Sequence, residues 1–158
     1  MLVAGLGEVQ VGQGPRYVLA CLGLGSCVGV SVYDPVTRVG GMAHIVLPES
    51  PPDASGKVGR YADLGVPLLL REVEALGACP SRLVAKMAGG AQIAMGSGVR
   101  DLFAIGSRNA AAVRAALERA GVYLAAADIG GNRGRSLRLY LDSGLVVVSV
   151  AGGASKEL

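Results

Sequence analysis

The residues best suited to chemistry in this sequence are a cysteine that follows a glycine-rich turn and the chain's single histidine. Cys27 comes directly after Gly25 and Ser26, and His44 lies further along the chain. Glycine lets the backbone turn sharply and approach a ligand closely, and amides exposed in such a turn can bind a developing oxyanion. The sequence therefore predicts Cys27 as a nucleophile, with the backbone around Gly25 and Ser26 as the oxyanion site.

A turn signature between Cys27 and His44 predicts that the two side chains meet. Asp34 and Pro35 occupy the first two positions of a type I turn, which closes at Thr37. If the flanking strands form a hairpin on that turn, Asp34 opposes Thr37 and Cys27 lies directly opposite His44. Directly opposed residues share one face of a sheet, with β-carbons roughly 4.5–5.5 Å apart. A slip of one residue would send the two side chains to opposite faces.

This geometry predicts nucleophilic attack by a cysteine–histidine pair. A neighbouring imidazolium lowers the pKa of a thiol, which is about 8.5 for a free cysteine, by several units. The thiolate would attack a carbonyl carbon, and the imidazolium would protonate the leaving group. We therefore expect Cys27 to act as the nucleophile and His44 as the base.

The three cysteines, Cys21, Cys27 and Cys79, are not expected to form a disulfide framework. Their number is odd, and a secretory signal is not expected from the N-terminal residues. With one histidine and no Cys-x-x-Cys pair, a zinc site is not expected, and no other metal or cofactor is indicated. A reversible Cys21–Cys27 bond would require α-carbons within about 7 Å.

The elements that must position these residues are mostly strands. Short runs rich in valine and leucine, bounded by glycine or proline, predict strands at 3–8, 17–22, 27–33, 39–47, 83–88, 122–127, 137–141 and 145–150. Apolar residues at helical spacing predict a helix from Ala62 to Leu76. After a glycine-rich stretch, Ser107 is a suitable N-cap for a second helix, which would end at Gly121. The chain is therefore expected to be an α+β domain.

Composition excludes several classes of protein. The 158 residues are 51% hydrophobic, and the formal net charge is +3 with basic residues spread along the chain. Such a chain is too hydrophobic to be disordered, and nucleic-acid binding would need a concentrated basic face. No apolar run approaches the roughly 18 residues of a membrane helix. We expect one cytoplasmic domain over residues 1–150, followed by a frayed tail at 151–158.

Five stretches together resemble the chemoreceptor glutamine deamidases of bacterial and archaeal chemotaxis, the CheD family. They are L-G-L-G-S-C at 22–27, G-M-A-H at 41–44 with Leu47-Pro48, K-V-G-R-Y-A-D at 57–63, K-M-A-G-G-A-Q at 86–92 and G-G-N-R-G-R at 130–135. They run in the family's order over nearly the whole chain. Any one of these motifs is weak, but together they are highly specific.

The resemblance implies a fold, a reaction and partners. The family's nucleophile and base match Cys27 and His44, and its members hydrolyse glutamine side-chain amides on receptor signalling helices through a thioester, releasing ammonia. Hydrolysis of receptor methyl esters is also attributed to them. They look like the catalytic domains of deamidating toxins, so a β-sandwich-like mixed-sheet core with two flanking helices is expected. The implied partners are a methyl-accepting chemoreceptor, as substrate, and a CheC-type phosphatase, which restrains the deamidase.

One departure from the family pattern concerns the third catalytic residue, which is typically a threonine and is Cys21 here. A thiol accepts a hydrogen bond from an imidazole less well than a hydroxyl does. Three interpretations stay open. Cys21 orients His44; a backbone carbonyl or another side chain, such as Asn132, does so; or turnover is weak and the protein acts mainly as a regulatory binding module for the phosphatase.

Further candidate residues each carry a purely structural alternative. Gln92 is expected either to line the cleft or to satisfy loop backbone groups. Asn132 and the two arginines near it are expected in the site, in receptor docking or in a solvated turn. Met95, Phe103 and Ile105 are expected either to be core residues or to form an apolar patch for a partner.

Overall fold

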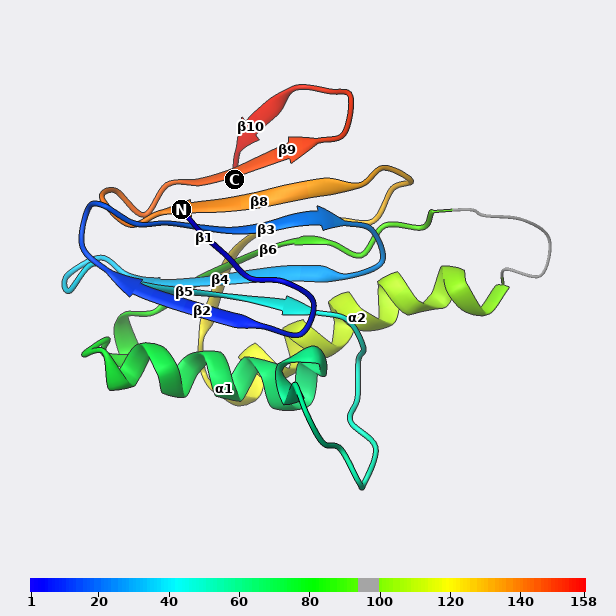
Figure 1. Ribbon diagram of the computed structural model, residues 1–158, viewed down its shortest axis with the longest axis horizontal. Helices are drawn as coiled ribbons and strands as arrows, with labels where there is room; N and C mark the ends of the chain where they lie inside the picture. The colour runs from blue at the N-terminus through cyan, green and yellow to red at the C-terminus, as the bar shows by residue number, and fades with distance from the viewer. Residues whose placement is uncertain (94–99) are drawn as a thin grey trace.

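Two five-stranded mixed sheets pack face to face, and both helices lie on the outer face of one of them (Figure 1). The computed structural model describes all residues except 94–99 and the side chains of 100–104. The first sheet has the order β1 (Leu2–Val3), β3 (Val18–Leu24), β8 (Arg135–Tyr140), β9 (Val146–Val150) and β10 (Ser155–Glu157). The second has the order β2 (Val9–Gln13), β5 (Val39–Ile45), β4 (Val28–Asp34), β6 (Val84–Gly89) and β7 (Tyr123–Ile129).

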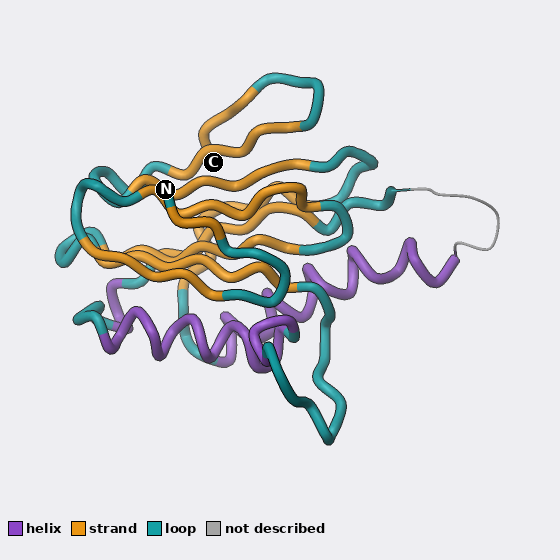
Figure 2. The backbone as a smooth tube through the Cα atoms, viewed as in Figure 1, coloured by secondary structure: helices purple, strands orange, loops and turns teal. Residues whose placement is uncertain are grey.

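The helices are α1 (Ala62–Ala75) and α2 (Arg100–Arg119), and short 3-10 turns lie at Val58–Arg60 and Pro80–Arg82. Figure 2 shows both helices on one side of the two layers of strands. The expected α+β class, with a sandwich-like core of mixed sheets and two main helices, is confirmed.

Two hydrophobic cores follow from this layering. One lies between the two sheets and includes Leu19, Met42 and Leu139. The other lies between the second sheet and the helices and includes Val30, Ile45, Leu69 and Val113. Every residue of β4 and β5 is buried, because the central strands of the second sheet have a core on each face.

The hairpin of β4 and β5 forms as expected, but its register is shifted by two residues. Asp34 pairs with Val39 instead of Thr37, and Gly29 instead of Cys27 lies directly opposite His44. The cause is Arg38, whose φ of 53° extends the connecting loop beyond the turn that Asp34 and Pro35 initiate. A shift of two keeps every side chain on its expected face, since the side-chain period of a strand is two residues.

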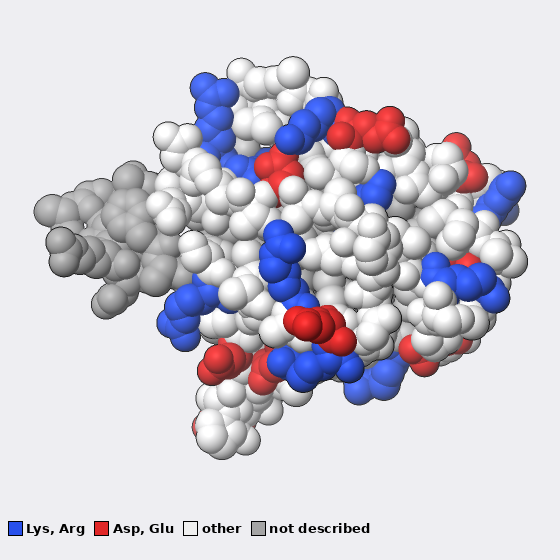
Figure 3. All heavy atoms as spheres, turned by 180° about the vertical axis from the view of Figure 1, so that it is seen from behind, with Lys and Arg blue, Asp and Glu red and all other residues white. Residues whose placement is uncertain are grey.

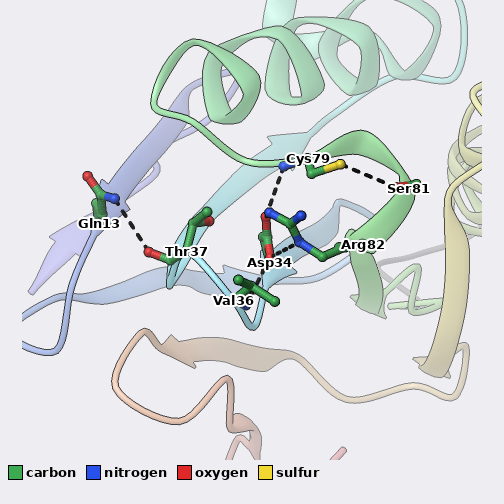
Figure 4. Close-up of polar contacts among 7 residues, drawn as sticks. All are labelled: Gln13, Asp34, Val36, Thr37, Cys79, Ser81 and Arg82. Carbon is green, nitrogen blue, oxygen red and sulfur yellow. Dashed lines mark hydrogen bonds and ion pairs between the residues drawn. The ribbon is translucent and has the colours of Figure 1, made fainter.

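The closed end of this hairpin is fastened by Asp34, whose side chain is fully buried (Figure 4). Its carboxylate accepts hydrogen bonds from the backbone N–H of Cys79 at 2.9 Å and from the Arg82 guanidinium at 3.0 and 2.8 Å. The Arg82 guanidinium holds the pKa of this carboxyl well below its usual value of 3.8. The bonds fix one end of β4, and Cys27 lies at the other.

Three other expectations about elements are wrong. Residues 3–8 are not one strand, because the chain turns after Val3, with the Glu8 carboxylate bound to the Gly5 N–H, and β2 begins only at Val9. The second helix begins at Arg100 and runs through Ser107. The tail is not frayed, since the chain reverses near Gly152 (φ 67°) and β10 pairs with β9.

Charged side chains of both signs are interspersed over the face shown in Figure 3. In the part of the chain that the structure describes, no helix is both long enough and apolar enough to cross a membrane.

Candidate active site

Three connections that cross from one sheet to the other meet at the same end of the molecule, on the right in Figure 1. They are the β1–β2 turn, the β3–β4 turn that carries Cys27, and the β7–β8 loop at 130–134. The chain after β6 holds two of them together through backbone bonds of 2.8 Å: Gly90 N–H to Cys27, Ala91 N–H to Gly25, and Gln92 N–H to Gly131. The predicted motifs are therefore brought together by main-chain contacts.

The β1–β2 turn holds His44 by its backbone and by its ring. The His44 N–H donates to the Glu8 carbonyl at 3.1 Å, and the His44 carbonyl accepts from the Gly7 N–H at 3.0 Å. The ring Nδ1 lies 3.1 Å from the Ala4 carbonyl oxygen. Because a carbonyl oxygen only accepts, we assign the hydrogen of the neutral ring to Nδ1. The other nitrogen, Nε2, then carries a free lone pair.

His44 is 3% exposed, and its Nε2 is buried without a hydrogen-bond partner among the described residues. The ring lies on the inter-sheet face of β5, the face it shares with Met42 in the core between the sheets. Cys27 packs against the same core. In the observed register, Cys27 and His44 are diagonal neighbours across the two strands. The β-carbons of such neighbours are typically a little less than about 7–8 Å apart. The structure thus places the predicted base and nucleophile on one face.

The charge state of the pair differs from the expected thiolate and imidazolium. Burial raises the pKa of the half-buried Cys27 thiol, an effect that its own backbone N–H partly offsets. Burial also lowers the pKa of His44, against the opposing effects of the Ala4 carbonyl and the Glu8 carboxylate. Desolvation disfavours the charged form of each group. The resting pair is therefore a neutral thiol and a neutral imidazole, and the expected lowering of the Cys27 pKa is wrong.

Cys21 lies in the same core between the two sheets, but its thiol is hydrogen-bonded to a backbone carbonyl instead of the His44 ring. Its Sγ is 3.6 Å from the Ala43 carbonyl oxygen, and its Cβ lies above Gly29, where an added Cβ would be 3.2 Å away. Burial raises the pKa of the Cys21 thiol far above its usual value, so it stays protonated and donates its S–H. The imidazole's observed partner is the Ala4 carbonyl. All three cysteines are free thiols.

The remaining sequence candidates lie at the rim or outside the described residues. Gln92 and Asn132 are exposed, and the loop contact made by Gln92 is through its backbone. Ile105 is half-buried in a hollow with Pro48 and Tyr61. Met95 and the side chain of Phe103 fall outside the described part, so the apolar partner patch stays a prediction.

Two buried polar residues support the site: Arg135, which the sequence had marked as a candidate for the site or for receptor docking, and Asn109, which it had not singled out. Arg135, 7% exposed, bonds to the Asp128 carboxylate at 2.8 Å and to the Gly130 carbonyl, which fixes the base of the β7–β8 loop. Asn109, fully buried on α2, bonds to the carbonyls of Ser26 and Val46. The sequence signal that could have identified Asn109 is its position, at helical spacing from the apolar residues of α2.

An open hollow lies next to the nucleophile turn. Gly23, Gly25 and Ile93 form part of its lining, and Arg135, Ser136 and Arg138 form another part. In the described residues, no group of three or more histidine, cysteine or acidic side chains is placed to hold a metal ion.

Comparison with known proteins places the chain in a family of chemotaxis proteins. Residues 46–154 match the family model described as CheD chemotactic sensory transduction. The chain is 47% identical to the probable chemoreceptor glutamine deamidase CheD of Symbiobacterium thermophilum, over 98% of this chain and 94% of that protein. It is 44% identical to the chemoreceptor glutamine deamidase CheD of Thermotoga maritima, over 99% and 96%. The chain belongs to the CheD family.

Similarity to solved structures is weaker. A Neisseria meningitidis protein of the DUF152 family aligns with a TM-score of 0.48 at 16% identity, over 90% of this chain and 71% of that one. The Bacillus licheniformis hypothetical protein YfiH aligns with a TM-score of 0.43 at 21% identity, over 78% and 49%.

Proposed function

We propose that this protein converts glutamine side chains of chemoreceptors to glutamate, with Cys27 as nucleophile and His44 as base. The relatives described above carry the name of this activity. The observation that carries the proposal is that His44 Nε2, which has no hydrogen-bond partner in the described part of the chain, lies on the face that His44 shares with Cys27.

The neutral pair defines how the reaction begins. His44 Nε2 takes the thiol proton as Cys27 Sγ attacks the amide carbon, and the carbonyl oxygen becomes an oxyanion. The Cys27 backbone N–H, which has no backbone acceptor among the described residues, is available to bind that oxyanion. The Nδ1–H bond to the Ala4 carbonyl stabilises the imidazolium that forms.

The second half of the reaction regenerates the thiol. The imidazolium transfers its proton to the amide nitrogen, the C–N bond breaks, ammonia leaves, and a thioester remains on Cys27. Water then attacks the thioester while His44 accepts its proton, and the tetrahedral intermediate collapses. The proton returns to the sulfur, and glutamate is released. No redox step or metal is required.

The hollow beside Gly25 is proposed to hold the receptor segment that flanks the target glutamine. Its lining combines apolar Ile93 with two polar residues, Ser136 and Arg138. Gln92 and Asn132 are exposed on the neighbouring loops, and both remain proposed substrate contacts.

The proposal is tested by incubating the protein with a receptor cytoplasmic fragment and following each glutamine by peptide mass spectrometry. Cys27→Ala and His44→Ala should each reduce conversion by at least about a hundredfold, because each removes a group that takes part in bond making. Cys79→Ala is the matched control, since its thiol is hydrogen-bonded to Ser81, near the far end of β4. Full conversion by Cys27→Ala would show that the nucleophile is wrong.

Two further proposals can be tested with the same protein and receptor fragment. The thioester route also allows hydrolysis of receptor glutamyl methyl esters, which methanol release would measure. The alternative function, a weakly active binding module for a CheC-type phosphatase, rests on Cys21 at the family's threonine position. It predicts phosphatase binding by wild type and Cys27→Ala alike, with little or no conversion of receptor glutamine by wild type.

A further inference from the structure

Asn109 connects the segment that carries the nucleophile to the segment that carries the base. Its side chain is fully buried, and its amide nitrogen donates to the Ser26 carbonyl at 3.0 Å and to the Val46 carbonyl at 2.9 Å. Ser26 directly precedes Cys27, and Val46 follows His44 by two residues. A primary amide has two hydrogens to donate, so both are used on these two carbonyls.

The bond to Ser26 fixes the orientation of the next backbone amide. Ser26 C=O and Cys27 N–H belong to one planar trans peptide, and they point in opposite directions. Holding the carbonyl toward α2 therefore turns the Cys27 N–H away from α2. That N–H also lowers the pKa of the Cys27 thiol, against the larger effect of burial. An amide beside the attacking sulfur is suitably placed to stabilise the oxyanion.

Packing alone gives no reason for an amide at this position. Among the described residues of α2, the other buried side chains on this face are those of Ala110, Val113, Ala116 and Leu117. Asn109 Oδ1 is buried with no hydrogen-bond partner among the described residues, which is unfavourable for stability. The two donated bonds are what this residue contributes, and both are made to the site.

We propose that Asn109 is a positioning residue for the hydrolysis: it aims the Cys27 N–H at the oxyanion and holds the nucleophile turn against the end of the base strand. The inference rests on the proposed function, because it assigns a role within that same site.

The test compares Asn109→Ala and Asn109→Asp with wild type and with Val113→Ala. The aspartate keeps the shape of the side chain and, when ionised, has no hydrogen to donate. Val113→Ala, one turn further along the buried face, is the control for loss of helix packing. For receptor glutamine conversion, we expect both Asn109 variants to lower kcat by about 10- to 1,000-fold, as for loss of an oxyanion donor. KM should stay nearly unchanged, and Val113→Ala should keep kcat.

A second measurement does not depend on catalysis. The rate of Cys27 alkylation by iodoacetamide is followed against pH, with the Cys27 peptide quantified by mass spectrometry. Loss of the bond to the Ser26 carbonyl frees the Cys27 N–H to turn away from the sulfur, so that it no longer lowers the pKa of the thiol. The pH midpoint of the alkylation rate should therefore be higher in both Asn109 variants than in wild type, and unchanged in Val113→Ala.

The outcomes separate the two proposals. If wild type converts no receptor glutamine, the proposed function fails, and the alkylation profiles alone decide the role of Asn109. If both Asn109 variants match Val113→Ala in kcat and in alkylation profile, the positioning role is overturned.

Discussion

Among the described residues, His44 is held by hydrogen bonds with three main-chain groups and with no side chain. Glu8 and Gly7 bond its backbone, and the Ala4 carbonyl bonds its ring. A backbone carbonyl remains in place whatever side chain the residue carries. The orientation of the proposed base therefore does not depend on the side chain at position 21.

Cys21→Thr should change kcat for receptor glutamine by less than about threefold, whereas losing a true orienting group of a catalytic histidine can cost about 10⁴. The threonine hydroxyl can donate to the Ala43 carbonyl as the thiol does. Steady-state kinetics on the receptor fragment measure this. A gain of tenfold or more would mean that the residue at position 21 orients the imidazole.

The pH dependence of kcat/KM follows from the neutral pair. Burial lowers the pKa of His44 below its usual 6.5, and only the unprotonated ring can take the thiol proton. Activity should therefore rise with pH through a midpoint below 6.5 and level off near neutrality. Glu8→Gln should move this limb to lower pH, because the Glu8 carboxylate favours the imidazolium. A wild-type midpoint above 6.5 would contradict the neutral pair.

At the scale of elements, the β4–β5 hairpin shows what could be predicted and what could not. Alternating residues and an Asp-Pro turn were enough to predict two paired strands with Cys27 and His44 on one face. The register was not predictable, because it depends on Arg38 in a left-handed conformation and on Arg82, which contacts Asp34 from a distant part of the chain. Periodicity reports which face a residue occupies more reliably than which residue it opposes.

The start of α2 was missed for a related reason. Glycines usually end helices, so the stretch up to Gly106 was expected to be a loop. In the structure Gly106 lies inside the helix, where an added Cβ would come within 2.6 Å of the Gly90 carbonyl oxygen. Because Gly106 has no side chain, α2 can pack closely against the loop after β6. Only the folded structure shows that approach.

Asp34→Asn should lower the free energy of unfolding at pH 7 by about 1–3 kcal/mol, because it removes a buried acceptor of charge-assisted hydrogen bonds. The pKa of Asp34 is depressed in the folded state, so its stabilisation is present above about 3.8 and is lost as the pH falls further. The difference from wild type should therefore shrink in acid.

Urea denaturation at several pH values measures the effect. Lys57→Met, which breaks the exposed ion pair with Glu8, is the control and should have little effect at pH 7. An equal loss in both variants would show that Asp34 does not fasten the hairpin.

At the scale of the whole molecule, β5 is a strand whose two faces contribute to the two hydrophobic cores. An added Cβ at Gly40 would collide with Leu141 of the inter-sheet core, and one at Gly41 would collide with Leu69 of the helix-facing core. The sequence predicted β3 to β9 and both helices, but it missed β2 and β10. It could not show how the strands divide between two sheets, because that depends on pairings between distant segments such as β3 with β8.

Gly40→Ala and Gly41→Ala should each lower the free energy of unfolding by about 1–3 kcal/mol, since each inserts a methyl group into a filled layer. Gly153→Ala, where an added Cβ meets its nearest atom at 3.5 Å, should stay within about 0.5 kcal/mol of wild type. Thermal and urea unfolding measure both. A harmless Gly41→Ala would mean that α1 can move away from β5.

The crossing connections give the site a mechanical property. His44 belongs to the second sheet, but its ring is held by Ala4, which directly follows β1 of the first, and Cys27 sits where the chain passes between the two. The proposed catalytic pair thus lies where the two sheets of the sandwich meet. If one sheet slides along the other, the hydrogen bond between the Ala4 carbonyl and the His44 ring must lengthen. Because that bond raises the pKa of His44, the alignment of the two sheets and the basicity of the imidazole change together.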